Sequence, residues 1–316
     1  MIFSVIAQGG QMFLVLLLAP LLTGVVRKMK ARLQRRQGAS VLQPYRDLRR
    51  LLGKDVVLAD NASWLFRVLP YLMFAVTWVA AALVPTFATG LLFSWSGDLI
   101  VITALLGTAR FLQAIAAMDV GTGFGGIGAS REVMFASLAE PAMIMTVFAV
   151  ALVAGSTQLS TVADYMMSGQ VGLRVSLALA LVAFVIVAIA ENARIPVDNP
   201  ATHLELTMVH EAMVLEYSGR HLAMIELAAS LKLLLYISLI ACIFVPFGMT
   251  AGRDGFFPYL LGAAAYLAKL AVAAVMLATF ETSIAKMRVF RVPGFIGVAL
   301  MLSLLATLLR FVSGNL

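Results

Sequence analysis

The sequence is organised into apolar blocks of roughly twenty residues, and this pattern constrains the fold more than any other feature. An α-helix rises 1.5 Å per residue, so about 20 residues span the hydrocarbon core of a bilayer. Only 12% of the 316 residues are charged, whereas a soluble domain has about 25%. The blocks do not alternate apolar and polar residues, so a membrane β-barrel is not expected and helices remain.

These blocks predict an all-α membrane protein with about eight transmembrane helices, formed as a single polytopic membrane domain over residues 1–316. The expected spans are 4–26, 67–90, 99–118, 133–154, 173–191, 229–248, 257–280 and 293–313. No basic residue precedes Arg27. The first block therefore lacks the basic start of a cleaved signal peptide, and we expect it to remain as a helix.

Lysine and arginine are distributed asymmetrically between the loops. Ten of them lie within residues 27–66, whereas the opposite side of the membrane would carry only Arg174, Arg253 and Arg310. The positive-inside rule then places two long loops, about 27–66 and 192–228, in the cytoplasm and both termini outside. Such charged loops on one face favour a docked partner, with attachment to anionic lipid as the alternative. Nucleic-acid binding is not expected, because no basic soluble domain is present.

Several ionisable residues lie within or at the ends of the expected spans. Charged groups are costly in a bilayer core and are therefore candidates for function. For any one of them, a structural ion pair or a side chain that extends to the interface is the alternative. The set comprises Arg110, Glu140, Glu191, Lys232, Lys269 and Glu281.

Residues 191–219 form the densest group of polar residues. Pro196 and Pro200 end any helix that continues from the fifth span, and a helix can restart near Thr202 with Glu205 as its third residue. Carboxylates in a partly dry site titrate near neutral pH, so this segment predicts a proton relay. An amphipathic surface helix is the alternative.

Two pairs in this segment would share helix faces. His203 and His210 lie seven residues apart, and Glu205 and Glu216 lie eleven apart. A metal held by the two histidines is a weak alternative. A zinc-protease motif fails, because Val214 stands where it needs a second histidine.

Nucleotide and metal-cluster motifs give little support for catalysis by this chain. Gly121, Gly123 and Gly126 match G-x-G-x-x-G, but no strand precedes them. We expect residues 121–128 to form a flexible loop and Ser130 to cap the fourth span. No Walker A sequence occurs, and the single cysteine, Cys242, excludes a cysteine-ligated cluster built by this chain alone.

Two loop motifs carry a family resemblance. Residues 31–38 (ARLQRRQG) and 42–47 (LQPYRD) resemble the first cytoplasmic loop of the NuoH family, a membrane component of respiratory complex I. Residues 191–219 resemble the long acidic loop of that family, and the resemblance extends over essentially the whole chain.

Within that family, four shorter motifs resemble the membrane subunits of energy-converting nickel–iron hydrogenases and formate hydrogenlyases. They are residues 119–121 (DVG), 128–132 (GASRE), 140–141 (EP) and 281–288 (ETSIAKMR).

The resemblance implies a membrane subunit that docks a peripheral electron-transfer arm and couples redox chemistry to proton or sodium movement. The implied partners are hydrogenase-like large and small subunits, an iron–sulfur subunit and antiporter-like membrane subunits. Iron–sulfur clusters, and a nickel–iron site in the hydrogenase branch, would lie on those partners, with no cofactor on this chain. The implied location is the cytoplasmic (inner) membrane of a bacterium or archaeon.

Residue roles follow from the same resemblance and from the ionisable groups in the spans. The proton-transfer candidates are Glu140, Glu191, Asp198, Glu205, Glu211, Glu216, His203, Lys232 and Lys269. The partner-docking candidates are Arg32, Gln34, Arg36, Asp47, Arg194 and Arg131, some of which would shape a quinone chamber in a complex I-type protein.

The sequence also departs from the family pattern at three positions. Val26 stands where the family usually has a glutamate, and Ala201 and His203 stand where an acidic pair is expected. His203 could replace a carboxylate in a relay, because its pKa is near neutrality. The alternatives to a coupling subunit are a quinone-site subunit, a standalone secondary transporter and a passive anchor.

Overall fold

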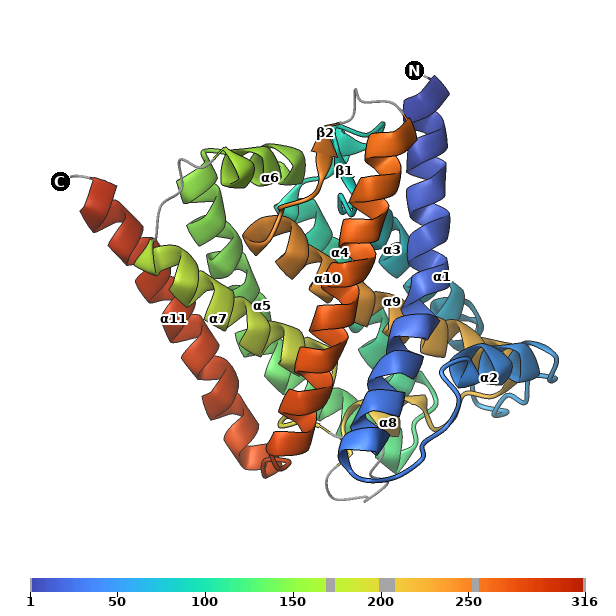
Figure 1. The fold of residues 1–316 in the computed structure, drawn as a ribbon. Helices are drawn as coiled ribbons and strands as arrows, with labels where there is room; N and C mark the ends of the chain where they lie inside the picture. The colour runs from blue at the N-terminus through green and yellow to red at the C-terminus, as the bar shows by residue number, and fades with distance from the viewer. Residues whose placement is uncertain (1, 169–173, 199–207, 252–255, 315–316) are drawn as a thin grey trace.

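Eight long helices form the body of the protein in this computed structural model, which describes residues 2–168, 174–198, 208–251 and 256–314 (Figure 1). Seven of the described helices are long and apolar enough to cross a membrane, and α7 is an apolar helix of 17 residues. The predicted all-α membrane fold is confirmed. The eight are α1 Ile2–Leu33, α3 Trp64–Leu83, α4 Leu99–Asp119, α5 Gly123–Ala154, α7 Val175–Glu191, α9 Gly219–Phe244, α10 Phe256–Ser283 and α11 Val292–Gly314.

Helix α9 packs against four other long helices, α1, α3, α7 and α10. Its Tyr236 and Leu234 are among the largest fully buried side chains. A second group is formed by α5, α7 and α11, which pack against one another. Many buried positions are alanines, which allow helix backbones to approach closely where lipid provides no hydrophobic driving force between helices.

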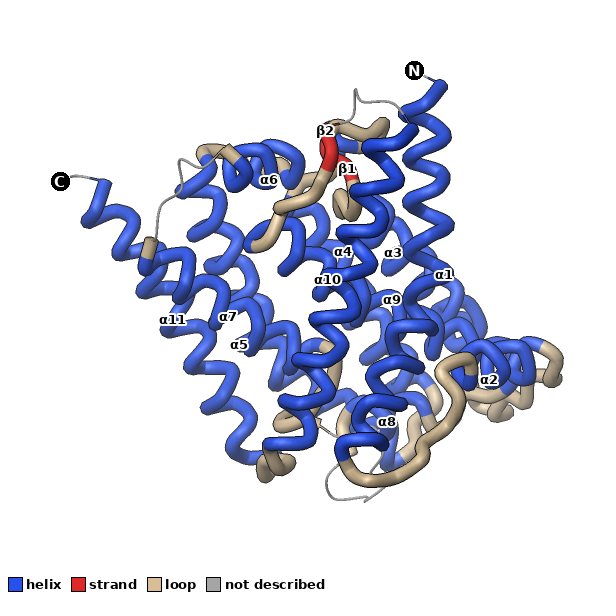
Figure 2. The backbone as a smooth tube through the Cα atoms, viewed as in Figure 1, coloured by secondary structure: helices blue, strands red, loops and turns tan. Residues whose placement is uncertain are grey.

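Short elements join these helices at the two ends of the bundle. The two-residue strands β1 Ala88–Thr89 and β2 Thr250–Ala251 pair in parallel and tie the α3–α4 connection to the α9–α10 connection (Figure 2). The remaining elements are η1 Ser94–Ser96, α6 Leu159–Met167, α2 Gln43–Leu52, α8 His210–Val214 and η2 Val289–Arg291.

The predicted end of the second span, at residue 90, lies beyond the end of the corresponding helix, α3. Helix α3 ends at Leu83, and Val84 is extended with ψ 119°. Pro85 follows Val84, and the residue before a proline is driven out of the helical region. At the other end, Ser63 caps the helix by accepting a hydrogen bond from the Leu65 amide at 3.1 Å.

Helix α5 corresponds to the fourth expected span and begins at Gly123, ten residues before the predicted start at 133. Thr122 caps α5 through the Gly125 amide at 3.2 Å. The prediction that residues 121–128 form a flexible loop is therefore wrong for most of that segment. Ser130 is inside the helix and donates to the Ile127 carbonyl. The glycines allow close packing: a Cβ on Gly125 would lie 2.3 Å from the Ala117 carbonyl oxygen.

Helix α9, which corresponds to the sixth expected span, also begins earlier than predicted, at Gly219 instead of residue 229. Helix α7 ends at Glu191, in agreement with the helix end that the following prolines predict. The helix expected from Thr202 lies outside the described residues. In the described part of that loop, the helix is α8, His210–Val214.

Candidate functional site

Arg110 of α4 is the centre of a buried charge cluster between the helices. Its Nε lies 3.3 Å from Glu132 Oε1 and its Nη1 lies 3.7 Å from Glu140 Oε1, both on α5. Its Nη2 forms an ion pair with Glu191 at the end of α7. One guanidinium thus faces three carboxylates from two other helices.

A second cation completes this cluster. Lys232 of α9 reaches Glu191 with 3.0 Å between Nζ and Oε2. Glu191 therefore lies between two cations that come from different helices. Charges taken out of water are tolerated only when they are paired and hydrogen-bonded, so the pairs explain how these groups remain buried within an apolar bundle.

Helix geometry places the two α5 carboxylates near the same guanidinium. Glu132 and Glu140 are eight residues apart, slightly more than two helical turns. Gly107 on α4 lies beside the second of them: a Cβ there would be in ordinary van der Waals contact, 3.6 Å from Glu140 Oε1.

The cluster differs in exposure from one end to the other. The Glu132 side chain is 11% exposed and that of Glu191 is 5% exposed, whereas Glu140 is 47% exposed. Glu140 therefore connects a buried set of charges to the outer surface of the helix bundle.

The cluster continues toward the α7–α9 connection through His210. Its Nε2 lies 3.2 Å from Gln113 Nε2 on α4. Its backbone amide donates to Asp198 at 3.4 Å, and Asp198 pairs with Lys286 at 2.6 Å. Burial lowers the pKa of His210 below its ordinary value, and the Glu132 carboxylate partly opposes this shift.

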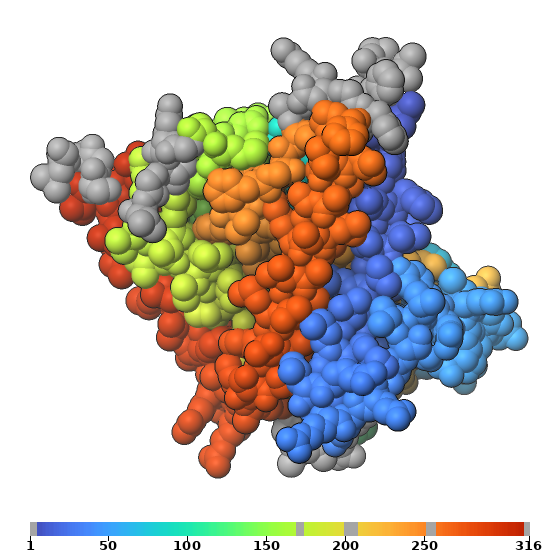
Figure 3. All heavy atoms as spheres, viewed as in Figure 1, coloured from blue at the N-terminus to red at the C-terminus, as the bar shows by residue number. Residues whose placement is uncertain are grey.

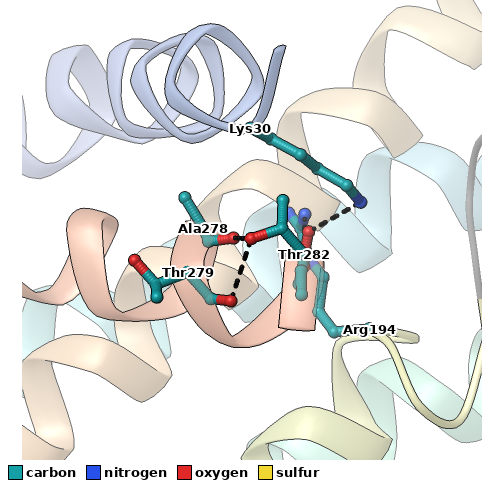
Figure 4. Close-up of polar contacts among 6 residues, drawn as sticks. Lys30, Arg194, Ala278, Thr279 and Thr282 are labelled. Carbon is teal, nitrogen blue, oxygen red and sulfur yellow. Dashed lines mark hydrogen bonds and ion pairs between the residues drawn. The ribbon is translucent and has the colours of Figure 1, made fainter. Parts of the chain in front are cut away.

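Glu281, at the end of α10, anchors a second charge cluster. Lys30 of α1 lies 3.0 Å from its Oε2, and Arg194, which follows α7, lies 3.3 Å from its Oε1. Figure 4 shows Lys30 and Arg194 reaching this end of the helix from different elements, beside Thr282. Burial lowers the pKa of Arg194, and Glu281 opposes that effect by stabilising the charged form.

Among the predicted proton-transfer residues, the structure gathers Glu140, Glu191 and Lys232 around Arg110. Asp198 joins this cluster through His210. The roles proposed for these residues remain predictions.

Five further proton-transfer candidates lie elsewhere or are not described. Glu205 and His203 lie outside the described residues. Glu216 is exposed after α8, and Glu211 is partly exposed on α8. Lys269 is partly exposed on α10 and forms no ion pair within the described part of the chain.

The predicted docking residues fall into two groups. Arg32, Gln34 and Arg36 are exposed where α1 ends, and the partly exposed Asp47 accepts a hydrogen bond from Gln43 on α2 at 3.1 Å. Arg194 and Arg131 are instead tied inward. Arg131 donates to the Met208 carbonyl at 2.7 Å.

Glu132 and Lys30 are cluster residues that the sequence pattern does not single out as site candidates. Glu132 lies one residue before the expected fourth span, and that boundary assigns it to a loop. A helix start at residue 123 would place it on the same helix as Glu140. Lys30 is one of ten basic residues in its expected loop. Within the described ranges, no group of three His, Cys, Asp or Glu side chains could hold a metal ion.

Comparison with known proteins identifies the family. A family model described as NADH dehydrogenase matches residues 8–311. The chain belongs to this NADH dehydrogenase family. The predicted resemblance is thereby confirmed, and it extends over nearly the whole sequence, including both charge clusters.

Curated relatives of this NADH dehydrogenase family member include hydrogenase-type proteins. Formate hydrogenlyase subunit 4 of Escherichia coli is 35% identical over 90% of this chain and 92% of its own length. Hydrogenase-4 component C of E. coli is 34% identical over 78% of this chain and 77% of its own length. NADH-quinone oxidoreductase subunit 8 of Rhodothermus marinus is 28% identical over 72% of this chain and 69% of its own length.

A solved structure shows the same fold. A chain of the membrane-bound sulfane sulfur reductase, an archaeal respiratory membrane complex, superposes with a TM-score of 0.82 over 97% of this chain and 99% of its own. At 20% identity this likeness concerns the fold alone. Together with the apolar helices, these relatives show a multi-pass membrane protein that resembles subunits of multi-subunit oxidoreductase complexes.

Proposed function

We propose that this chain is the coupling membrane subunit of a hydrogenase-type oxidoreductase complex and that the Arg110 cluster carries the proton path. The observation that carries the proposal is the contact of one buried guanidinium with Glu132, Glu140 and Glu191. Such a cluster can hold a variable number of protons, because the charge on one carboxylate changes the cost of ionising the others.

The path begins at the α7–α9 connection. Asp198 and His210 lie in this connection, which is on the cytoplasmic side in the orientation that the loop charges predict. Gln113 links His210 to α4, from which Arg110 extends. Two donors of Arg110, Nε and Nη1, make no hydrogen bond among the described residues, so they are sites at which bridging water can bind.

The path ends at Glu140. Its half-exposed carboxylate lies within a membrane helix, where contact with lipid alone is unfavourable. A helix of an antiporter-like partner would cover it and accept the proton.

The peripheral arm docks on the cytoplasmic side, where this path begins. The exposed Arg32, Gln34 and Arg36 at the end of α1 provide a polar docking surface there. The hydrogenase-like large and small subunits and the iron–sulfur subunit would hold the metal centres. The location that follows is the inner membrane of a prokaryote, with both termini outside.

The test uses the intact complex reconstituted in liposomes, with the Glu132→Gln and Glu140→Gln variants. Each should keep electron transfer while lowering proton movement per electron, because a glutamine keeps the shape and cannot release a proton. Glu226→Gln is the matched control, since Glu226 is exposed on α9 and belongs to no ion pair in the described structure. Full proton movement in both cluster variants would refute the path.

A standalone secondary transporter is the second candidate. Recovery of this chain alone from membranes, with solute transport retained in liposomes, would favour it over the coupling subunit. Co-purification with hydrogenase-like subunits would exclude it.

A further inference from the structure

Lys269 is an ionisable residue that the charge clusters do not use. It lies near the middle of α10, thirteen residues after Phe256 and fourteen before Ser283. Thirteen residues correspond to about 20 Å along a helix, and the hydrocarbon core extends about 15 Å from its centre to either interface. A lysine side chain of four methylene groups cannot carry its ammonium to water from that depth.

No acid of the described chain neutralises this ammonium. The ion pairs within the described ranges involve Lys30, Lys232 and Lys286, but not Lys269. Among the titratable groups, the buried thiol of Cys242 interacts with Lys269, and a thiol is a poor counterion. A cation at this depth requires an acceptor, and hydrocarbon offers none.

The side of α10 next to Lys269 is also uncovered. Tyr266 hydrogen-bonds to Ser238 of α9 at 2.7 Å, which fixes the buried side of the helix. Val272 and Met276, three and seven residues after Lys269, are 58% and 68% exposed. In Figure 3, α10 lies along the surface of the molecule beside α1. Only 22% of its apolar window is buried, against 44% for α3.

We propose that this face of α10 binds a membrane helix of a partner subunit, and that this helix presents an aspartate or glutamate to Lys269. Charge complementarity selects this occupant. A second copy of this chain, related by a two-fold axis at the same face, would bring two Lys269 ammonium groups together. Lipid would cover the apolar residues but leave the ammonium without a partner. The inference goes beyond the proton path and does not depend on it.

The experiment places a photo-crosslinking amino acid at position 276 of the full chain in native membranes, with and without changes at Lys269. In the otherwise unchanged chain we expect a crosslink to one partner subunit, at a membrane helix that contains a carboxylate. Lys269→Glu should lower the crosslink at least about tenfold, because it opposes two like charges in a buried interface. Lys269→Arg is the matched control and should retain it.

A charge exchange then separates pairing from general disruption. Replacing the partner's acid by lysine in the Lys269→Glu background should restore the crosslink. Lys269→Met removes the charge without adding one and should also weaken the crosslink, which covers the case in which Lys269→Glu prevents folding. Crosslinks to lipid or to a second copy would overturn the inference, as would a crosslink that Lys269→Glu and Lys269→Met leave unchanged. Proton movement is read separately, so this proposal and the proton path can fail independently.

Discussion

The ammonium of Lys232 lies 3.0 Å from Glu191 Oε2, and the same carboxylate also pairs with Arg110. The two cations come from α9 and α4, while Glu191 ends α7. This one carboxylate therefore joins three helices at the level of the candidate proton path. Protonation of Glu191 would weaken its ion pairs with both cations at once. A change in its protonation would therefore alter contacts among three helices.

Lys232→Met tests how much the contact between Lys232 and Glu191 contributes to the stability of the protein. It leaves Glu191 with Arg110 alone, and removing one member of a buried ion pair costs roughly 3–5 kcal/mol when nothing else compensates. We expect a smaller loss, about 1–3 kcal/mol, because Arg110 remains. The midpoint of thermal unfolding of the detergent-purified complex measures it. Lys232→Arg is the control, and an unchanged midpoint in Lys232→Met would show that the contact contributes no stability.

Two glycines of α5 offer a matched pair of substitutions. A Cβ on Gly128 would lie 2.9 Å from both Met213 Cγ and the Val209 carbonyl oxygen, whereas a Cβ on Gly126 meets nothing within 4 Å. Gly128→Ala should therefore destabilise the protein by about 1–3 kcal/mol through overpacking. Gly126→Ala should be neutral or stabilising by up to about 1 kcal/mol, because alanine favours the helix.

The same thermal measurement compares these two variants. Equal midpoints would show that the approach of α8 to α5 does not depend on the small residue at position 128. A lower midpoint in Gly126→Ala alone would contradict the packing described for this face.

His210 predicts a pH dependence with a defined sign. Burial lowers its pKa from the ordinary value of 6.5, so the unfolded state binds the proton more readily than the folded state. Stability should therefore fall as the pH decreases below about 6.5, and the loss should end where the folded His210 itself becomes protonated. Hydrogen exchange of the α8 amides, followed between about pH 7.5 and 5, measures it. A His210→Gln variant should show a weaker dependence over this range.

Glu281→Gln should loosen the junction between α1, α10 and the segment after α7. The change leaves Lys30 and Arg194 with a neutral acceptor in place of a carboxylate. We expect faster proteolytic cleavage within residues 34–42, which follow α1, since Lys30 would no longer fix the end of that helix. Asp47→Asn is the control, because its pair with Arg50 is largely exposed and such pairs contribute little. Identical cleavage rates in both variants would argue against this role.

The sequence by itself determined the fold class and most of the helices. Blocks of apolar residues long enough to cross a bilayer leave few alternatives, because every backbone amide must be satisfied within the segment. The end of α7 at Glu191 and the cap at Ser63 also follow from local chemistry. The loop motifs predicted the family correctly.

Only the tertiary structure decided which charges meet. Arg110 and Glu191 are 81 residues apart in the chain, and no local pattern indicates that they form one ion pair. The glycine-rich pattern of residues 123–128 is typical of a loop, yet packing against Ala117 and Met213 makes them part of a helix. That helix start brings Glu132 into the cluster. The length of an apolar block specifies whether a helix can cross a bilayer, whereas the partners of a buried charge depend on how helices distant in sequence pack together.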